Sequence, residues 1–306
     1  MTMAIPTRGL HGTQDAALKA FTAAHLPMIE AAVARACKDL LPLAPEHEAA
    51  LADALDVGGG QAHRWRPLVL LCATDACGGT PAQAVDVGAA LELTHTASLV
   101  LDDLPCMDDA RLRRGRPATH QQVGTAGAIL LAVGLLGRAA ELIGRAPAGA
   151  AMLSRAWGRA VGLAGMSGGQ VMDLRVREGQ KLTGAARRLY REKTTALAAL
   201  SAEAGGVLAG APEACLVALH RYGAALGWAY QLRDDDQDIE EDSVGGLRLL
   251  ALEQAALRRA RLVERAERAL MGAPWVRPES AWALAAAARR IGGVPAAALR
   301  DRHSAS

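Results

Sequence analysis

The chain has 306 residues, of which 51% are hydrophobic and 3% aromatic, and its formal net charge is +2. This apolar fraction is enough for a large buried core, and basic residues dispersed among acidic ones exclude a general nucleic-acid binder. Ala and Leu outnumber the β-branched and aromatic residues that strands prefer, which favours helices.

Taken in chain order, apolar residues recur at the three- and four-residue spacing of amphipathic helices. We expect the first helix to be interrupted near Pro27, and Gly-rich turns to end the second and third. No segment alternates like a strand. These features predict an all-α bundle of about ten or more helices, forming a single domain over residues 1–306. The expected helices are 13–38, 45–55, 66–76, 81–103, 127–142, 149–176, 184–206, 212–238, 249–271 and 280–291.

Three features bear on where the protein works. Its five cysteines show neither metal-ligand spacing nor an even count, which is typical of free thiols in a reducing cytosol. Residues 1–23 lack the charged segment and apolar run of a signal peptide. The longest continuously apolar stretch, 126–136, is shorter than the roughly 20 residues of a membrane-spanning helix. We expect a soluble, cytoplasmic protein with no stable membrane insertion.

Two acidic clusters follow strongly apolar helical segments. Carboxylates at the end of a helix repel one another and oppose its dipole, and a divalent cation removes that cost. Mg²⁺ prefers oxygen ligands and keeps substrate phosphates in its coordination shell. Either cluster alone is equally well explained as a solvated helix end, and neither has EF-hand spacing. The clusters contain Asp102, Asp103, Asp108 and Asp109 in the first, and Asp234, Asp235, Asp236 and Asp238 in the second.

The spacing of the acidic residues shows which side chains share a helix face in the second cluster but not in the first. Asp234 and Asp238 are four residues apart and share a helix face. In the first cluster Pro105 breaks regular winding, so spacing does not show which later Asp turns inward.

Basic residues accompany the acidic clusters along the chain. The segment 111–116 follows the first cluster, 63–66 precedes the third expected helix, and Lys193 lies inside a later one. Arg holds phosphate with a planar fork, and Lys does so as a point charge. Singly these would be surface charges. Together with the acidic clusters they indicate a cleft for a polyanionic, metal-bound ligand.

Several of these motifs resemble those of trans-isoprenyl diphosphate synthases, and most closely bacterial geranylgeranyl diphosphate synthases of the carotenoid type. The segment Glu92–His120 is similar to the first Asp-rich region of that family. Gly168-Gly169-Gln170-x-x-Asp173, Lys193-Thr194 and Gln231-x-x-Asp234-Asp235-x-x-Asp238 follow in the family's order, so the resemblance covers about residues 55–245.

The resemblance implies a fold, an activity and partners. The fold is an all-α isoprenoid-synthase bundle around a deep apolar pocket, usually a homodimer. The activity is Mg²⁺-dependent, head-to-tail prenyl transfer. The prenyl donor is dimethylallyl, geranyl or farnesyl diphosphate, the acceptor is isopentenyl diphosphate, and diphosphate is released. Such chemistry rests on metals and positioned donors, so no nucleophilic side chain is expected.

The resemblance also implies roles for individual residues. About three Mg²⁺ ions bind with the diphosphate. Arg113 is similar to the arginine that holds the allylic diphosphate. Arg114, His63, Arg66 and His95 match the isopentenyl diphosphate site. The expected metal ligands are Asp102, Asp103, Asp108, Asp234, Asp235 and Asp238, and the expected catalytic set is Lys193, Thr194 and Gln231, on the allylic side, with Arg113.

The sequence departs from the family pattern in three places. His63 stands where a Lys usually holds diphosphate, which predicts weaker isopentenyl diphosphate binding that improves as the imidazole is protonated. The stretch 240–248 lacks the usual Gly/Lys-rich closing loop, and Arg248 is either its substitute or a surface charge. Ala132-Val133 replaces a Gly-Asp pair, as in the carotenoid-type enzymes.

Two small residues bear on product length. Ala97 and Ser98 lie four or five positions before Asp102, where family members form the pocket floor. Without an aromatic side chain there, we expect geranylgeranyl diphosphate, with farnesyl diphosphate as the alternative. Ala97→Phe should then shorten the product, unless a deeper residue sets the length.

Three other functions are weighed against this one. A terpene cyclase of the same fold needs an Asn/Ser/Glu metal triad in place of Asp234-Asp235-x-x-Asp238. A weakly active or non-catalytic partner subunit fits the missing loop and His63, although both Asp motifs are kept. A purely structural helical scaffold leaves the acidic and basic clusters unexplained.

Overall fold

The computed structural model describes residues 11–38, 40, 43–60, 62–242 and 246–295, and the side chains in these ranges except those of 235–253. Within these ranges the all-α prediction is confirmed, and the only other regular element is a short hairpin. The helices are α1 (His11–Lys38), α2 (Pro45–Leu55), α3 (Trp65–Ala76), α4 (Pro81–Asp102), α5 (Thr119–Gly144), α6 (Ala150–Val161), α7 (Met166–Arg177), α8 (Gly184–Leu208), α9 (Glu213–Asp242), α10 (Gly246–Ala269) and α11 (Pro278–Ile291).

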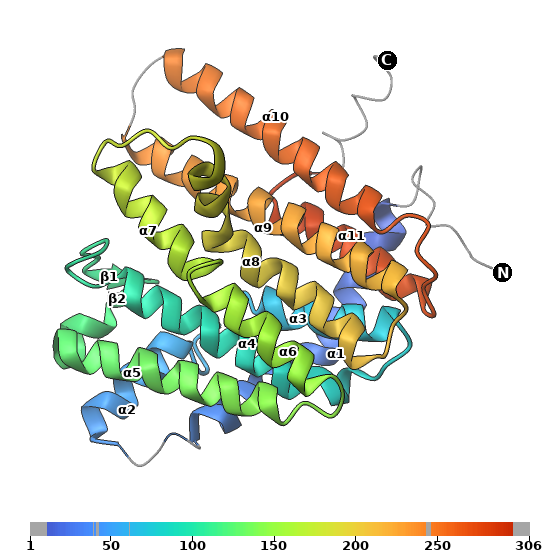
Figure 1. Ribbon diagram of the computed structural model, residues 1–306, viewed down its shortest axis with the longest axis horizontal. Helices are drawn as coiled ribbons and strands as arrows, with labels where there is room; N and C mark the ends of the chain where they lie inside the picture. The colour runs from blue at the N-terminus through green and yellow to red at the C-terminus, as the bar shows by residue number, and fades with distance from the viewer. Residues whose placement is uncertain (1–10, 39, 41–42, 61, 243–245, 296–306) are drawn as a thin grey trace.

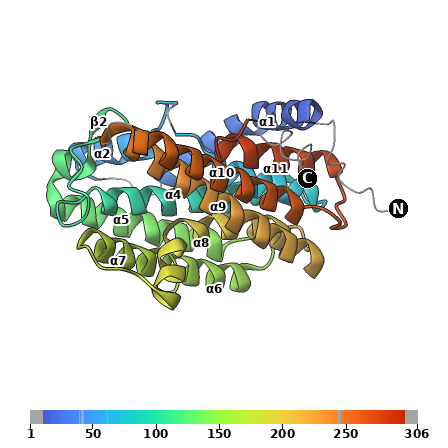
Figure 2. The ribbon, with the colours of Figure 1, turned by 90° about the horizontal axis from the view of Figure 1, so that it is seen from above.

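Two helices form the centre of the bundle. Helix α4 packs against α1, α3, α5 and α8, and α8 packs against α3, α7 and α9 (Figures 1 and 2). Because α4 is surrounded, it is apolar on nearly every face and buries most of its residues between 84 and 100. Its C-terminal end, Asp102, is half-buried, so the first acidic cluster begins where the core ends.

The expected helix 149–176 is two helices, and that prediction was wrong. α6 ends at Val161 and α7 begins at Met166. The chain turns between Gly162 and Gly165, where a Cβ on Gly165 would lie 2.2 Å from the carbonyl oxygen of Ala160. Only glycine fits such a turn. The sequence did not reveal the break between the helices, because helical periodicity continues on both sides of it.

Two further predictions differ from the structure at prolines and glycines. α1 runs through Pro27 without interruption, and Pro27 is exposed, so water can solvate the carbonyl left unpaired by the missing N–H. α5 starts at Thr119, earlier than the expected 127, because it continues across a kink at Gly124 with φ of 73°.

A two-stranded hairpin was not expected from the sequence. β1 (Leu112–Arg113) pairs antiparallel with β2 (Arg116–Pro117). Arg114 and Gly115 form the turn with φ of 52° and 74°, the left-handed pair of a tight hairpin. The hairpin therefore folds the basic segment back toward the first acidic cluster.

Two helices pass a simple test for membrane-spanning segments. α4 and α5 are long and apolar enough, but 72% of the relevant window in α4 and 50% of that in α5 are buried inside the bundle. Core helices of soluble proteins share these properties, so the observation is weak evidence for a membrane protein.

Candidate active site

A cavity of about 1230 Å³ opens beside the ends of α4 and α7 and runs inward between α4, α6 and α8. Charged and polar side chains line its mouth, and apolar ones line its inner part. The volume slightly exceeds the usual range for small-molecule sites, so a long ligand with one polar end fits it.

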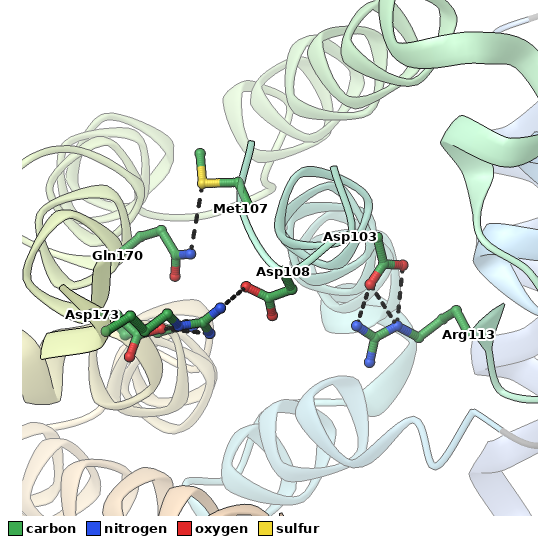
Figure 3. Close-up of polar contacts among 8 residues, drawn as sticks. Asp103, Met107, Asp108, Arg113, Gln170 and Asp173 are labelled. Carbon is green, nitrogen blue, oxygen red and sulfur yellow. Dashed lines mark hydrogen bonds and ion pairs between the residues drawn. The ribbon is translucent and has the colours of Figure 1, made fainter. Parts of the chain in front are cut away.

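The carboxylates at the mouth come from three separate segments. Asp102 ends α4, Asp108 follows in the next turn, Asp173 lies on α7 and Asp234 on α9, and all four line the cavity. Figure 3 shows Asp108 between the Asp173 side of the mouth and Asp103. The fold therefore brings Asp234 of the second acidic cluster to the same opening as Asp102 and Asp108 of the first.

The environment of Asp102 disfavours the ionised form of its carboxyl group. Burial raises the pKa of its carboxyl to about 6, while the positive charge of Lys193 opposes the rise. Among the described residues, no cation pairs directly with it. A half-buried carboxylate without a direct partner is destabilising when ionised, so this position is suited to a cationic ligand.

Asp103 lies apart from the other predicted metal ligands. Its side chain is buried and paired with Arg113, whose Nε lies 3.1 and 3.2 Å from the two carboxylate oxygens, with a second short contact from Nη2 (Figure 3). Asp103 lines a small separate crevice and not the main cavity. The hairpin delivers Arg113 to this pair, so Asp103 orients the arginine that does line the cavity.

Two cations join the far wall of the mouth to the acidic residues. Arg177 on α7 contacts Asp108 at 2.5 Å and Asp173 at 3.1 Å, and Lys193 Nζ on α8 lies 2.6 Å from the same Asp173 carboxylate. Lys193 is held close to α7 because Gly169 packs directly on it. A Cβ at Gly169 would lie 2.2 Å from the Lys193 backbone nitrogen.

A second group of cations lines the mouth on the α3 side. Arg66 is 5% exposed, and its Nε has no hydrogen-bond partner in the described structure. Its guanidinium lies 4.3 Å from the Trp65 ring centre and 5.8 Å from that of Tyr230. A buried guanidinium with an unpaired donor suits an anionic ligand.

His95, His63 and Arg114 complete this second group, and all three line the same cavity as Arg66. Burial, followed by the neighbouring Arg66 and Arg114, lowers the pKa of the His95 imidazole well below its usual value. His95 is therefore neutral near pH 7 and can accept or donate a single hydrogen bond.

Arg64 has a structural role although it is only two residues from Arg66. It is 2% exposed and its fork contacts Glu30 at 2.9 Å and Glu92 at 2.9 Å, with a further bond to the Leu55 carbonyl. It adopts a left-handed conformation immediately before α3. These contacts fix the start of α3, and thereby hold His63 and Arg66 at the cavity.

The residues expected on the allylic side also lie together. Thr194 on α8 forms a short hydrogen bond with the side chain of Gln231 on α9, and both line the mouth with Lys193. The Asp235 and Asp238 side chains lie outside the described residues, as does Arg248. Residues 243–245 of the stretch expected to replace the closing loop are likewise outside them.

The two predicted length-setting residues face different ways. Ser98 lines the cavity one turn below Asp102, and Thr94 lines it a further turn inward. Ala97 is fully buried in the core and does not line the cavity. The inner apolar walls come from α5, α6 and α8, through Leu136, Val161 and Leu197.

The donor chemistry of the mouth fits Mg²⁺. Among the described residues, no group of three or more potential ligands is close enough to hold a metal ion alone. Mg²⁺ needs no such cage, because it is commonly held by one or two carboxylates together with substrate phosphates. Asp102, Asp108 and Asp234 offer carboxylates around one opening, with arginines nearby for the phosphate oxygens.

Some residues of the site were missed by sequence reasoning. Arg177, Met107, Tyr190 and Tyr230 all line the cavity. Arg177 had a signal, since it lies four residues after Asp173 and shares its helix face. Met107 contacts Gln170 at 3.9 Å across the mouth (Figure 3), which no local pattern indicates.

Comparison with known proteins gives consistent results. Residues 48–245 match the sequence model of the polyprenyl synthetase family. The chain is 36% identical over 199 residues to a farnesyl diphosphate synthase of Bacillus subtilis, covering 62% of this chain and 66% of that enzyme. It is 36% identical over 242 residues to a geranylgeranyl diphosphate synthase of Pantoea ananas, covering 76% of each.

A solved structure extends the match to nearly the whole fold. The crystal structure of an FPP/GFPP synthase from Zymomonas mobilis superposes with a TM-score of 0.73 at 29% identity, covering 91% of this chain and 99% of that one. In sequence, the chain spans about two thirds of the B. subtilis relative and about three quarters of the P. ananas one.

Proposed function

The chain belongs to the polyprenyl synthetase family, and from that premise we propose that it transfers the prenyl group of an allylic diphosphate to isopentenyl diphosphate. The single observation that carries the proposal is the division of one cavity into a mouth with carboxylates and arginines and an apolar inner part. A diphosphate and a hydrocarbon tail are the two halves of a prenyl diphosphate.

Mg²⁺, when bound, neutralises diphosphate oxygens and so makes diphosphate a better leaving group. Asp102, Asp108 and Asp234 would hold it, with Asp235 and Asp238 proposed as further ligands. Arg113, oriented by Asp103, holds the allylic diphosphate. The allylic C–O bond breaks and diphosphate departs with the electron pair.

Lys193, Thr194 and Gln231 lie at the mouth, where the positive charge of Lys193 stabilises the departing diphosphate and the oxygen dipoles of Thr194 and Gln231 stabilise the allylic cation. Arg66, Arg114, His95 and His63 hold isopentenyl diphosphate with its double bond toward that cation. The double bond attacks, a carbon–carbon bond forms, and the proton lost in restoring a double bond goes to the departed diphosphate.

We favour geranylgeranyl diphosphate as the product. Ser98 is small, so the tail can pass the first turn of α4 below the mouth. Farnesyl diphosphate is the alternative, because the similar proteins include synthases of both products. The cavity volume of about 1230 Å³ leaves room for the longer tail.

The proposal includes a homodimer in the cytoplasm, with each copy forming one domain. Leu130 and Val133 on α5 are 70% and 59% exposed, and Ile129 is also exposed, which leaves an apolar face for a second copy to cover. Sedimentation would show a dimer that Leu130→Glu with Val133→Glu dissociates. A monomer before mutation would contradict this part.

The deciding experiment incubates the purified chain with Mg²⁺, labelled isopentenyl diphosphate and, separately, dimethylallyl, geranyl and farnesyl diphosphates. Products are dephosphorylated and sized. Elongation that stops on adding a chelator supports the proposal. No elongation from any starter would favour a non-catalytic partner subunit, and diphosphate release without isopentenyl diphosphate would favour a cyclase.

A further inference from the structure

The inner end of the cavity is closed at one level on three helices. The lining ends at Thr94 on α4, at Val161 on α6 and at Leu197 on α8. One turn further inward, Ala90 on α4 and Ser201 on α8 are fully buried and do not line the cavity.

On α6 the residue one turn inward from Val161 is Trp157, and it reaches across to α4. Its indole Nε1 donates a hydrogen bond of 2.9 Å to the Thr94 hydroxyl. That hydroxyl in turn donates to the Ala90 carbonyl at 2.8 Å, so its orientation is set by the α4 backbone. Trp157 does not itself line the cavity, so its indole lies directly behind Thr94, the last cavity-lining residue of α4.

This contact makes the indole a rigid barrier. Trp157 packs on the hydrophobic core, and Leu153 and Ala160 on the same face of α6 are buried. A Trp with its N–H bonded has little freedom to swing aside, in contrast to an aliphatic chain. Because Thr94 itself is small, the bulk that closes the cavity here comes from α6.

We propose that Trp157, fixed by its hydrogen bond to Thr94, is the rigid support behind the Thr94 floor that limits product length in this chain. The inference rests on the proposed prenyl transfer and adds a specificity-determining residue on a helix that carries none of the predicted site residues. The growing tail passes Ser98 and stops at Thr94, which the indole holds from behind, so length is set by α6 as well as by α4.

The first test sizes the products of Trp157→Ala. We expect products at least one five-carbon unit longer than those of the unchanged protein, because removing the indole opens space beyond Thr94. Thr94→Val, which keeps the shape but removes the hydrogen-bond acceptor, should give a mixed and smaller shift. Unchanged product lengths in a folded Trp157→Ala protein would overturn the proposal.

A matched control removes a different indole. Trp228 lies on α9 and, like Trp157, does not line the cavity, but its ring stacks at 5.0 Å on Arg191, which does not line the cavity either. Trp228→Ala should therefore leave the product distribution as it was. A lengthening equal to that of Trp157→Ala would mean that general loosening of the bundle, and not the floor, explains both.

A second measurement separates this inference from the proposed function. Binding of farnesyl, geranylgeranyl and geranylfarnesyl S-thiolodiphosphates, which resist ionisation, is measured by calorimetry with Mg²⁺ on the unchanged chain and on the milder Trp157→Leu. We expect affinity to fall about tenfold or more once the tail exceeds the floor, and Trp157→Leu to remove that fall.

Each outcome decides one of the two proposals. A chain that binds these analogues with the expected length limit but elongates nothing would refute the proposed function and retain the floor. An equal fall in Trp157→Leu, or no binding of any prenyl analogue by either protein, would overturn the floor.

Discussion

The mouth and the inner end of the cavity share only the helices α4 and α8, and they are built by opposite rules. At the mouth, buried charges are gathered although each is costly alone, as with Asp102 and Arg66. At the inner end, polar groups are satisfied, as with the Trp157–Thr94–Ala90 chain of hydrogen bonds. Unsatisfied groups therefore indicate where a ligand binds, and satisfied ones where it stops.

The largest effect should come from removing a mouth carboxylate. Asp102→Asn is expected to lower the rate of prenyl transfer by about 100-fold or more, because a metal-binding charge is lost. The folded protein should be no less stable, since a half-buried, unpaired carboxylate becomes neutral. Turnover assays and thermal unfolding of the same preparation measure both effects.

Asp109→Asn is the control for that prediction. Asp109 is exposed, does not line the cavity, and has φ of 48°, a conformation that Asn tolerates well. Its activity should match that of the unchanged protein. If Asp109→Asn lowered the rate of prenyl transfer as much as Asp102→Asn does, the effect would not depend on a carboxylate that lines the cavity.

The next effect concerns the spacing of α7 and α8. Gly169→Ala would force a Cβ to within 2.2 Å of the Lys193 nitrogen, so the helices must separate. We expect a loss of about 1–3 kcal/mol in unfolding free energy and a lower rate through displaced Lys193.

Gly158→Ala on α6, where a Cβ meets nothing within 4 Å, serves as the comparison. It should be neutral or stabilise the protein by about 0.4–1 kcal/mol. Chemical denaturation of both variants decides the point. Equal stability for the two would mean that the close approach at Gly169 is not rigid.

The third prediction concerns Ser98 and Ala97, at the level where the mouth of the cavity meets its inner part. Ser98→Phe places a ring in the cavity and should shorten the product while the protein stays folded. Ala97→Phe, once expected to do so, should instead destabilise the core by about 1–3 kcal/mol, because Ala97 is fully buried away from the cavity. Product sizing and unfolding curves distinguish them. Shortening by Ala97→Phe alone would reverse the assignment.

The smallest effect is a pH dependence at the mouth. The pKa of His95 is lowered by burial and by Arg66, so the unfolded chain takes up a proton below about pH 6.5 and the folded one does not. Stability is therefore full above that pH and falls as the pH decreases. His95→Gln should reduce the fall between about pH 7 and 5 in denaturation experiments. An identical pH profile would exclude this contribution.

The sequence predicted the helices and the residue types at the mouth better than it predicted which side chains face the cavity. Periodicity located most helices, and the chemistry of carboxylates and arginines indicated a diphosphate-metal site. What failed was conformational detail held by long-range contacts. The neighbours Ala97 and Ser98 are both small residues in the sequence, and only packing shows that Ser98, and not Ala97, faces the cavity.

The glycine turn at 162–165 and the hairpin at 112–117 were missed for a related reason. Both depend on backbone conformations that helical periodicity does not report, and both have large consequences for side chains far away in sequence. The hairpin brings Arg113 to Asp103, and the turn aims α7 so that Asp173 and Arg177 meet the first acidic cluster.

Asp102, Ser98 and Thr94 mark successive turns of α4, and in the proposed function the first serves the chemistry and the other two contact the tail. A family using such an arrangement can change the length of its product without losing activity, because the residues that contact the tail are not those that assist cleavage of the C–O bond. Selection could then move a lineage from one chain length to another by single substitutions, each intermediate remaining an active enzyme.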